Sequence, residues 1–514
     1  MSYNTLTRTE NVTKNLAFGV ISKVFLLGAT FLVRTLFIRI LGAEYTGVSS
    51  LYSNILSLLN LAELGFGSVL TYELYKPLKD NDEETVAALV LLFKKIYTAI
   101  IAVILSVGLL LIPFLKYIVK SDLNQQDLLI YYVLYLADSV ASYFVAYRTM
   151  VIEADQKRYV INLAEIITKF VMYICQSVYL VVTKDFLGYL VIQVVFTVIK
   201  NISLHVASLK MYPYLEHISK EASKVQLETS RIYKNAKAMC VTKISTVILN
   251  QTDSIIISML LGTVYVGYYS NYYMLIVYLN SIYNIIVTSI EASVGNLNAE
   301  LDTQKSYGVY KKIDFLIFCM NVFCVAEYVC IVQDFIAVWI GDGYIQKMSL
   351  VAALMITFYF QQAMNTVVTY RQTMGLFEAT KKVYPIMAFL NIVLSVGLGV
   401  RMGVAGVALA TGLSRFFTSF WYEGKVVFEK MGHSLSEYLT KQLLNGVFTV
   451  VTVLMAYWLV SLITLRGLLI AVIIKALLTG LIVIAMLFTV YHSSDEWKWI
   501  IGYINKRVKL RGNI

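Results

Sequence analysis

Charged side chains recur inside the long apolar segments of this chain. A charge at the centre of a bilayer is costly unless it is paired or faces a watery cavity, so each one marks a candidate functional position. The cations at depth are Lys23, Arg34, Lys169, Lys200, Lys243, Arg415 and Lys475. The carboxylates at depth are Glu63, Asp138, Glu165, Asp253, Glu291 and Glu327. A cavity rich in fixed cations would select an anion, because arginine holds phosphate with two hydrogen bonds and lysine acts as a point charge.

Some of these charges have a structural explanation beside the functional one. Glu165 and Lys169 stand one helical turn apart, so a local ion pair would account for both. Lys23 and Lys243 lie near one end of their segments, where a lysine either reaches the interface with its ammonium group or lines a cavity. The sequence leaves both explanations open.

The candidate substrate-binding residues are the cations that would line a cavity: Arg34, Lys23, Lys200, Lys243 and Arg415. For the deeper ones the alternative is a buried structural ion pair. The candidate residues for ion coupling or charge balance are Glu63, Asp253 and Glu291. They would either bind a coupling cation or neutralise the nearby positive charges, and the sequence does not separate these roles.

The elements that must position these charges are long apolar helices. The chain has 514 residues, of which 58% are hydrophobic and 15% charged, whereas a soluble domain has about 25% charged residues. Mostly apolar segments of about 20 residues recur along the whole chain, which indicates membrane-spanning helices. Strands are not expected, because a single segment in lipid must satisfy its own backbone hydrogen bonds. We predict an all-α integral membrane protein with about fourteen transmembrane helices.

The distribution of positive charge sets the predicted orientation. Most of the 43 lysine and arginine residues fall in alternate connecting segments, and such segments stay on the cytoplasmic side. Both termini are therefore expected in the cytoplasm. The net charge of +11 is then an orientation signal, and no nucleic-acid partner is expected, because the basic residues are not gathered on a soluble module.

The second half of the chain repeats the first, which predicts a duplicated bundle. The sequence LGAEYTG at 41–47 returns as LGTVYVG at 261–267. Further matches follow in the same order: Asn60 with Asn280, Lys94-Lys95 with Lys311-Lys312, and Tyr147-Arg148 with Tyr370-Arg371. We therefore expect two pseudo-symmetric six-helix lobes plus two C-terminal helices. The predicted parts are a first lobe at 1–209, a cytoplasmic linker at 210–235, a second lobe at 236–427, two further helices at 428–491 and a basic cytoplasmic tail at 492–514.

Catalytic apparatus is not evident in the sequence. The four histidines are scattered, and there is no HExxH, P-loop or GxSxG motif. We expect no enzymatic activity, no cofactor and no metal. Tyrosine is frequent, at 38 residues, and clusters at 265–283. Its ring and hydroxyl suit sugars, although an interfacial aromatic belt explains most of the cluster. Cations and hydroxyls beside lipid would fit an amphiphile with an anionic phosphate, a polar glycan and an apolar tail.

Several stretches resemble the polysaccharide-synthesis branch of the multidrug/oligosaccharidyl-lipid/polysaccharide exporter superfamily. The resemblance covers nearly the whole chain, and these stretches carry it: 34–41 with the LGAEYTG turn, NLAELGFG at 60–67, LYKP at 74–77, and NQTD at 250–253 leading to LLGTVYVGYYS at 260–270. It implies two six-helix lobes around a cavity, two further helices and alternating access. Carried over by position, it points to Arg34 and, less directly, to Lys23, Lys243 and Arg415 as cavity cations that meet a diphosphate or acidic sugars.

The resemblance also implies a function. Members of this branch are similar to flippases that move undecaprenyl-diphosphate-linked oligosaccharide units to the outer leaflet for O-antigen, capsule or exopolysaccharide assembly. The implied location is the bacterial cytoplasmic membrane. The implied partners are a lipid-linked anionic oligosaccharide, membrane lipids, and a polysaccharide polymerase with its chain-length machinery.

Three alternatives stay open. A flippase for lipid II or another lipid-linked sugar would differ in the glycan it accepts. A multidrug antiporter of the same superfamily would need an acidic cavity for cationic drugs, whereas this chain has a basic one. An integral-membrane glycan polymerase or transferase usually needs a large outer loop with acid and base groups. Here the longest predicted outer loops, at about 113–126 and 333–347, hold few carboxylates, among them Asp122 and Asp334.

Overall fold

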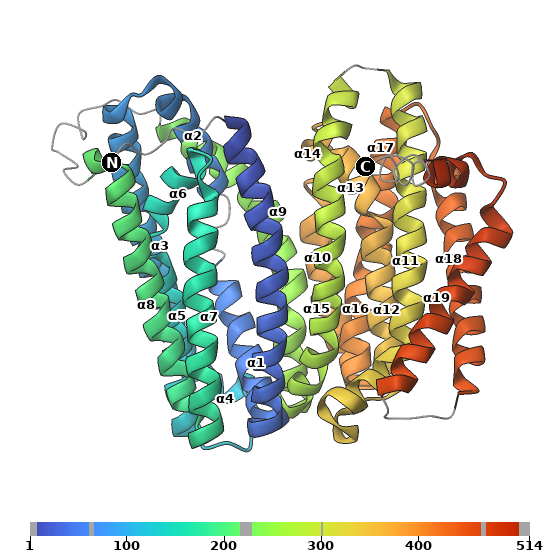
Figure 1. The fold of residues 1–514 in the computed structure, drawn as a ribbon, viewed down its shortest axis with the longest axis horizontal. Coiled ribbons are helices and arrows are strands. Elements are labelled where there is room, and N and C mark those ends of the chain that lie inside the picture. Colours follow the sequence, from blue (N-terminus) through green and yellow to red (C-terminus); the bar gives the residue numbers. More distant parts are fainter. Residues whose placement is uncertain (1–7, 61–65, 216–228, 300–301, 464–468, 503–514) are drawn as a thin grey trace, which may run out of the picture. The chain divides into compact units, whose positions relative to one another are not determined.

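The computed structural model describes residues 8–60, 66–215, 229–299, 302–463 and 469–502, and within these ranges the regular structure is helical, without strands. The chain divides into two compact units, Met1–Gly267 and Tyr268–Ile514 (Figure 1). The helices of the first unit are α1 (Arg8–Leu59), α2 (Phe66–Asp80), α3 (Glu83–Leu111), α4 (Leu115–Ile118), α5 (Gln125–Tyr143), α6 (Ala146–Ala154), α7 (Arg158–Thr183), α8 (Phe186–Met211) and α9 (Thr229–Leu261).

The second unit continues the helical architecture from the body of α10 onward. Its helices are α10 (Thr263–Ala299), α11 (Thr303–Ile340), α12 (Met348–Ala363), α13 (Asn365–Thr373), α14 (Phe377–Thr380), α15 (Val383–Met402), α16 (Val404–Arg415), α17 (Trp421–Lys430), α18 (Leu435–Ser461) and α19 (Leu469–Tyr491). A π-helical turn at Phe416–Phe420 joins α16 to α17.

Polar side chains cap the first turns of several of these helices. Asp82 accepts a hydrogen bond from the Thr85 amide at the start of α3, and Asp302 accepts one from the Lys305 amide at the start of α11. Such caps satisfy backbone donors that have no partner inside the helix. The hydrogen bonds from Thr85 lower the pKa of the Asp82 carboxyl.

The described helices include eleven that are long and apolar enough to cross a membrane, or twelve if the bent pair α5 and α6 counts as one span. The all-α membrane fold is therefore confirmed, while the count of fourteen spans, the cytoplasmic termini and the boundaries of the predicted parts stay predictions. One reason for the lower count is α1, because the backbone of Gly42 is not helical and divides α1 into two helical segments. Another is the stretch from α16 to α17, which is interrupted by the π-helical turn and is not among the eleven.

The repeated LGxxYxG turns pack directly on each other within the first unit. A Cβ on Gly47 would lie 1.8 Å from the Thr263 carbonyl oxygen, and a Cβ on Gly267 would lie 2.1 Å from the Ala43 carbonyl oxygen. Ala43 and Thr263 hold the same place in the two turns, as do Gly47 and Gly267, so the contact is nearly self-symmetric. Glycine is required on both sides because the two backbones touch. The Glu44 carboxylate accepts hydrogen bonds from Ser121 and Thr263 beside this crossing.

The repeat extends to hydrogen bonds inside each unit. In the first unit the Asn60 side-chain oxygen accepts a hydrogen bond from Ser139 on α5, at 3.1 Å. In the second unit the Asn280 side-chain oxygen accepts one from Gln362 on α12, at 2.5 Å. The two asparagines thus perform the same structural task in both copies, which links the sequence repeat to a repeated fold.

The last two helices are attached to α11 in the second unit, where α11 packs on both α18 and α19 (Figure 1). Lys441 of α18 pairs with Asp314 at 3.3 Å, and Lys475 of α19 pairs with Asp334 at 2.5 Å. Apolar clusters around Val322 and Cys330 fill the space between these pairs. The sequence predicted that Asp334 lies in an outer loop. This prediction is wrong, because α11 continues to Ile340.

Candidate functional site

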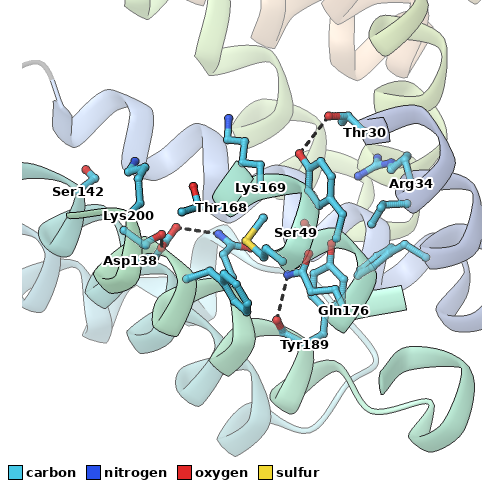
Figure 2. Close-up of a pocket in the computed structure, with 17 residues that line it drawn as sticks. Thr30, Arg34, Ser49, Asp138, Ser142, Thr168, Lys169, Gln176, Tyr189 and Lys200 are labelled. Atoms are coloured by element: carbon cyan, nitrogen blue, oxygen red, sulfur yellow. Dashed lines mark hydrogen bonds between the residues drawn. The ribbon is translucent and has the colours of Figure 1, made fainter. Parts of the chain in front are cut away.

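The first unit contains a polar cavity of about 390 Å³ between α1, α5, α7 and α8. These helices pack against one another in pairs, α1 with α7, α7 with α8 and α5 with α8. Figure 2 shows the side chains that point into the hollow. The lining residues are Thr30, Val33, Arg34, Phe37, Ser49, Asp138, Ser142, Thr168, Lys169, Met172, Tyr173, Gln176, Tyr189, Gln193, Phe196, Thr197 and Lys200.

The spacing of polar residues on two apolar helices explains why they face inward. On α8 the lining residues recur as Tyr189, Gln193, Phe196, Thr197 and Lys200, which is the spacing of one helical face. The opposite face of α8 exposes apolar side chains: Leu187, Val191, Val195, Val198 and Ile202. Helix α7 follows the same rule, with polar residues in the lining and exposed apolar residues on its other face. Both helices therefore turn a polar face to the cavity and an apolar face away from it, as expected around a hydrated cavity in a membrane protein.

One end of the cavity holds the Arg34 guanidinium among hydroxyl and aromatic groups. Arg34 donates a hydrogen bond from Nη2 to the Ser50 hydroxyl at 3.3 Å. Tyr189 lies close enough to experience the Arg34 charge, and the Thr30 and Tyr173 hydroxyls bond to each other at 3.0 Å. A guanidinium framed by hydroxyls is well suited to hold a phosphate oxygen.

The other end holds a cluster of charged groups around Asp138. Gln193 Nε2 and Thr197 Oγ1 donate hydrogen bonds to the two Asp138 oxygens, at 2.7 and 2.5 Å. Lys169 pairs with Glu165 at 2.6 Å, which confirms the intrahelical pair that the sequence suggested, and Lys169 also lines the cavity. The Lys200 ammonium group is close enough to Asp138, Glu165 and Lys169 to interact with their charges.

The structure thus brings Arg34 and Lys200 together in one cavity. It does not place the other candidates there. Arg415 lies in the second unit near the fully buried Glu423 carboxylate, which is 3.3 Å from the Nε atom of Arg371. Asp253 is buried on α9, and Glu291 is half-buried on α10. The side chains of Lys23 and Lys243, and the whole of Glu63, lie outside the described residues.

Sequence reasoning passed over the uncharged members of the site. Gln176, Gln193 and Thr197 are uncharged polar residues on largely apolar helices, whereas the predicted candidates at depth are all charged residues. The signal that would have found them is their spacing, because Gln193 and Thr197 lie one turn apart on the face that carries Lys200. The Gln176 side chain donates to the Tyr189 carbonyl at 3.1 Å and ties α7 to α8 beside Arg34.

Comparison with solved structures identifies the fold. The chain is similar to the lipid II flippase MurJ in an inward closed conformation, with a TM-score of 0.66 and 13% identity over 93% of this chain and 99% of that chain. It is also similar to an inward-facing MATE family multidrug resistance transporter of the MOP superfamily, with a TM-score of 0.64 and 12% identity over 80% of this chain and 95% of that chain. A third match is a point mutant of the Vibrio cholerae MATE transporter VcmN, with a TM-score of 0.54, 11% identity, and coverage of 83% and 98%. A search of curated proteins gave no match.

These matches define the class: a multi-pass membrane protein with the fold of the MurJ flippase and the MATE transporters. A family model described as polysaccharide biosynthesis protein matches residues 12–290, more than half of the chain. The chain belongs to this polysaccharide biosynthesis family. The predicted transporter agrees with this fold, and the predicted multi-pass membrane protein agrees with the eleven described apolar helices.

Proposed function

We propose that this protein is a flippase that moves undecaprenyl-diphosphate-linked oligosaccharide units to the outer leaflet of the cytoplasmic membrane by alternating access. The observation that carries the proposal is the polar cavity of the first unit, in which the Arg34 guanidinium faces a hollow inside a membrane-spanning bundle and Lys200 and Asp138 lie at the other end (Figure 2). Membership in the polysaccharide biosynthesis family supports a glycan as the cargo.

The energetics of buried charge favour a transported anion. A cation at membrane depth persists only where it is paired or hydrated, and this cavity gives such groups a polar environment. An anionic headgroup docked there would exchange its water shell for charge-assisted hydrogen bonds, which are roughly twice as strong as neutral ones. The lipid tail can stay in the bilayer, because the headgroup alone needs the cavity.

The direction of movement agrees with the membrane potential. Moving a negative charge outward across an inside-negative membrane is favourable by about 2.3 kcal/mol per charge per 100 mV. A diphosphate would therefore gain several kcal/mol without a coupled ion. The carboxylates Glu63, Asp253 and Glu291 remain our proposed sites for ion coupling or charge balance. We expect the exported units to pass to a polysaccharide polymerase and its chain-length machinery for O-antigen, capsule or exopolysaccharide.

A lipid II flippase is the second candidate function, because the chain shares its fold with MurJ over nearly the full length of both proteins. The two functions differ in the glycan that is accepted. Proteoliposomes that offer either lipid-linked oligosaccharide or lipid II would separate them.

The test uses purified protein in liposomes loaded with undecaprenyl-diphosphate oligosaccharide, with outward exposure read by a glycosidase that cannot cross the membrane. Arg34→Gln should lower the initial rate at least about tenfold, because a hydrogen bond to a charged group contributes about 1.5–3 kcal/mol. The matched control is Arg39→Gln, since Arg39 is exposed on the same helix. Equal rates for both variants and the wild type would overturn the proposal.

A further inference from the structure

The two ends of the cavity differ in charge. At the Asp138 end, the ammonium groups of Lys169 and Lys200 face the carboxylates of Asp138 and Glu165. Two positive and two negative groups leave this end with no net charge. Asp138 is the sole carboxylate among the described residues that line the cavity, so the lining near Arg34 consists of hydroxyl, amide and aromatic groups instead.

The two ends also lie at different positions along α8. Tyr189 is close enough to Arg34 to interact with its charge, and Lys200 is close enough to Asp138 to do the same. Both residues are on α8, and between them lie Gln193 and Thr197, which donate hydrogen bonds to Asp138 and stand one and two turns beyond Tyr189, about 6 and 12 Å along a helix. Figure 2 shows Arg34 and Thr30 on one side of the cavity and Lys200, Asp138 and Ser142 on the other. A diphosphate held by Arg34 would therefore leave the Asp138 end to another part of the substrate.

The Asp138 end offers dense hydrogen bonding. Each Asp138 oxygen accepts one bond from the protein and keeps a further lone pair. Lys200 makes no ion pair or hydrogen bond with the rest of the chain as the structure describes it, so its three donors are available. The exposed Ser142 hydroxyl and the Phe196 ring complete this part of the lining. Donors and acceptors beside an aromatic face match the alternating hydroxyls and C–H surface of a sugar.

We propose that the Asp138 end is a sugar subsite, in which Asp138 and Lys200 bind hydroxyl groups of an uncharged sugar next to the diphosphate. This inference rests on the proposed function and assigns different tasks to two cations that sequence reasoning treated alike. Arg34 holds the anion, and Lys200 binds the glycan. An acidic sugar gains no net attraction there, because this end of the cavity has no net charge.

The test compares two ligands on the full-length protein in nanodiscs: a prenyl diphosphate without sugar and the same lipid with one neutral hexose. The wild type should bind the hexose-bearing lipid about tenfold more tightly, since one or two well-made hydrogen bonds contribute roughly that factor. Asp138→Asn and Lys200→Met should each remove this preference and leave the Kd of the bare lipid within about twofold. Matched controls are Asp127→Asn on α5 and Lys210→Met on α8, both exposed.

The outcomes separate the two proposals. Equal affinity of the wild type for both lipids overturns the sugar subsite and leaves the flippase intact. Loss of bare-lipid binding in Lys200→Met also overturns it, because Lys200 would then belong to the anion site. Failure of the wild type to bind either lipid overturns both proposals. Arg34→Gln should weaken both lipids equally, and unchanged bare-lipid binding in the other variants shows that they are folded.

Discussion

The interiors of the two units solve the same problem in different ways. In the first unit, α1, α5, α7 and α8 leave a polar cavity that Arg34 and Lys200 line. In the second unit the repeat-related helices α12, α15 and α16 pack closely. Thr357 donates to the Ala408 carbonyl at 2.7 Å, and a Cβ on Gly406 would lie 2.1 Å from the Leu398 carbonyl oxygen. Between these equivalent helices the first unit holds a hollow, whereas in the second unit the backbones of α12, α15 and α16 are in close contact.

The buried arginines of the two repeats also differ in their partners. In the second unit Arg371 is 4% exposed and is neutralised by Glu423, which is fully buried. Its repeat counterpart in the first unit, Arg148, is 7% exposed and lies near His205, and its Nε donates to the Tyr147 hydroxyl at 3.2 Å. A membrane protein must supply each buried cation with a partner or with a wet space. The partner, and not the charge alone, therefore tells whether a position is structural or functional.

A larger hollow in the second unit shows that volume alone does not identify a site. It measures about 900 Å³ and is lined mainly by apolar and aromatic residues of α11, α12, the π-helical turn and α18, with no charged side chain among its described lining residues. The smaller cavity of the first unit holds Arg34, Asp138, Lys169 and Lys200. The smaller cavity therefore has the charged side chains that could bind an anionic headgroup.

The strongest test of this contrast removes each buried arginine in turn. Arg371→Ala should cost about 3–5 kcal/mol of unfolding free energy, because it removes the partner of the buried Glu423. Arg148→Ala should cost about 1 kcal/mol, the usual contribution of one hydrogen bond. Chemical unfolding of both variants in the same detergent gives the comparison. Similar losses would mean that Arg148 has a structural partner of equal strength.

A rescue experiment sharpens this result. The double variant R371A/E423A removes both charges of the pair, so it should recover part of the loss in Arg371→Ala. If the unfolding free energies lost in the two single variants simply add in the double variant, another group must neutralise Glu423. The nearby Arg415 is the first candidate.

The second test concerns the crossing of the repeated turns. Gly47→Ala and Gly267→Ala should each cost about 1–3 kcal/mol, as expected when a methyl group is forced into a closed contact. The two losses should be alike, because each new Cβ meets a backbone carbonyl of the other turn. Gly28→Ala is the control on α1, where a Cβ meets nothing within 4 Å. A neutral effect at Gly47 would show that the turns separate readily.

The sequence predicted much of the fold because apolar length and a repeat are properties of the chain itself. The LGxxYxG turns and the two asparagines indicated the duplication, and the structure places each pair in equivalent contacts. The sequence could not say which cations share a cavity, since that depends on which helix faces meet. Arg34 and Lys200 come together because α1 and α8 both pack on α7, and Arg415 is instead close to Glu423.

The ends of the helices were predicted less well for a related reason. Asp334 was assigned to an outer loop because a charge after an apolar run usually marks the membrane surface. In the structure α11 continues past it, since Lys475 of α19 supplies the opposite charge at 2.5 Å. A partner 141 positions away in the chain cannot be seen in a local pattern.

The smallest expected effect compares the two asparagines. Asn60→Ala and Asn280→Ala should each cost about 1 kcal/mol, because each leaves a hydroxyl or amide donor of the next helix without its acceptor. Asn280→Ala should cost slightly more, since Gln362 is 1% exposed and cannot turn to water, whereas Ser139 is half-buried. Thermal unfolding in detergent measures both. If Asn60→Ala also lowers the flipping rate while Asn280→Ala does not, Asn60 acts on the cavity through α5, because its donor Ser139 adjoins Asp138 in the chain.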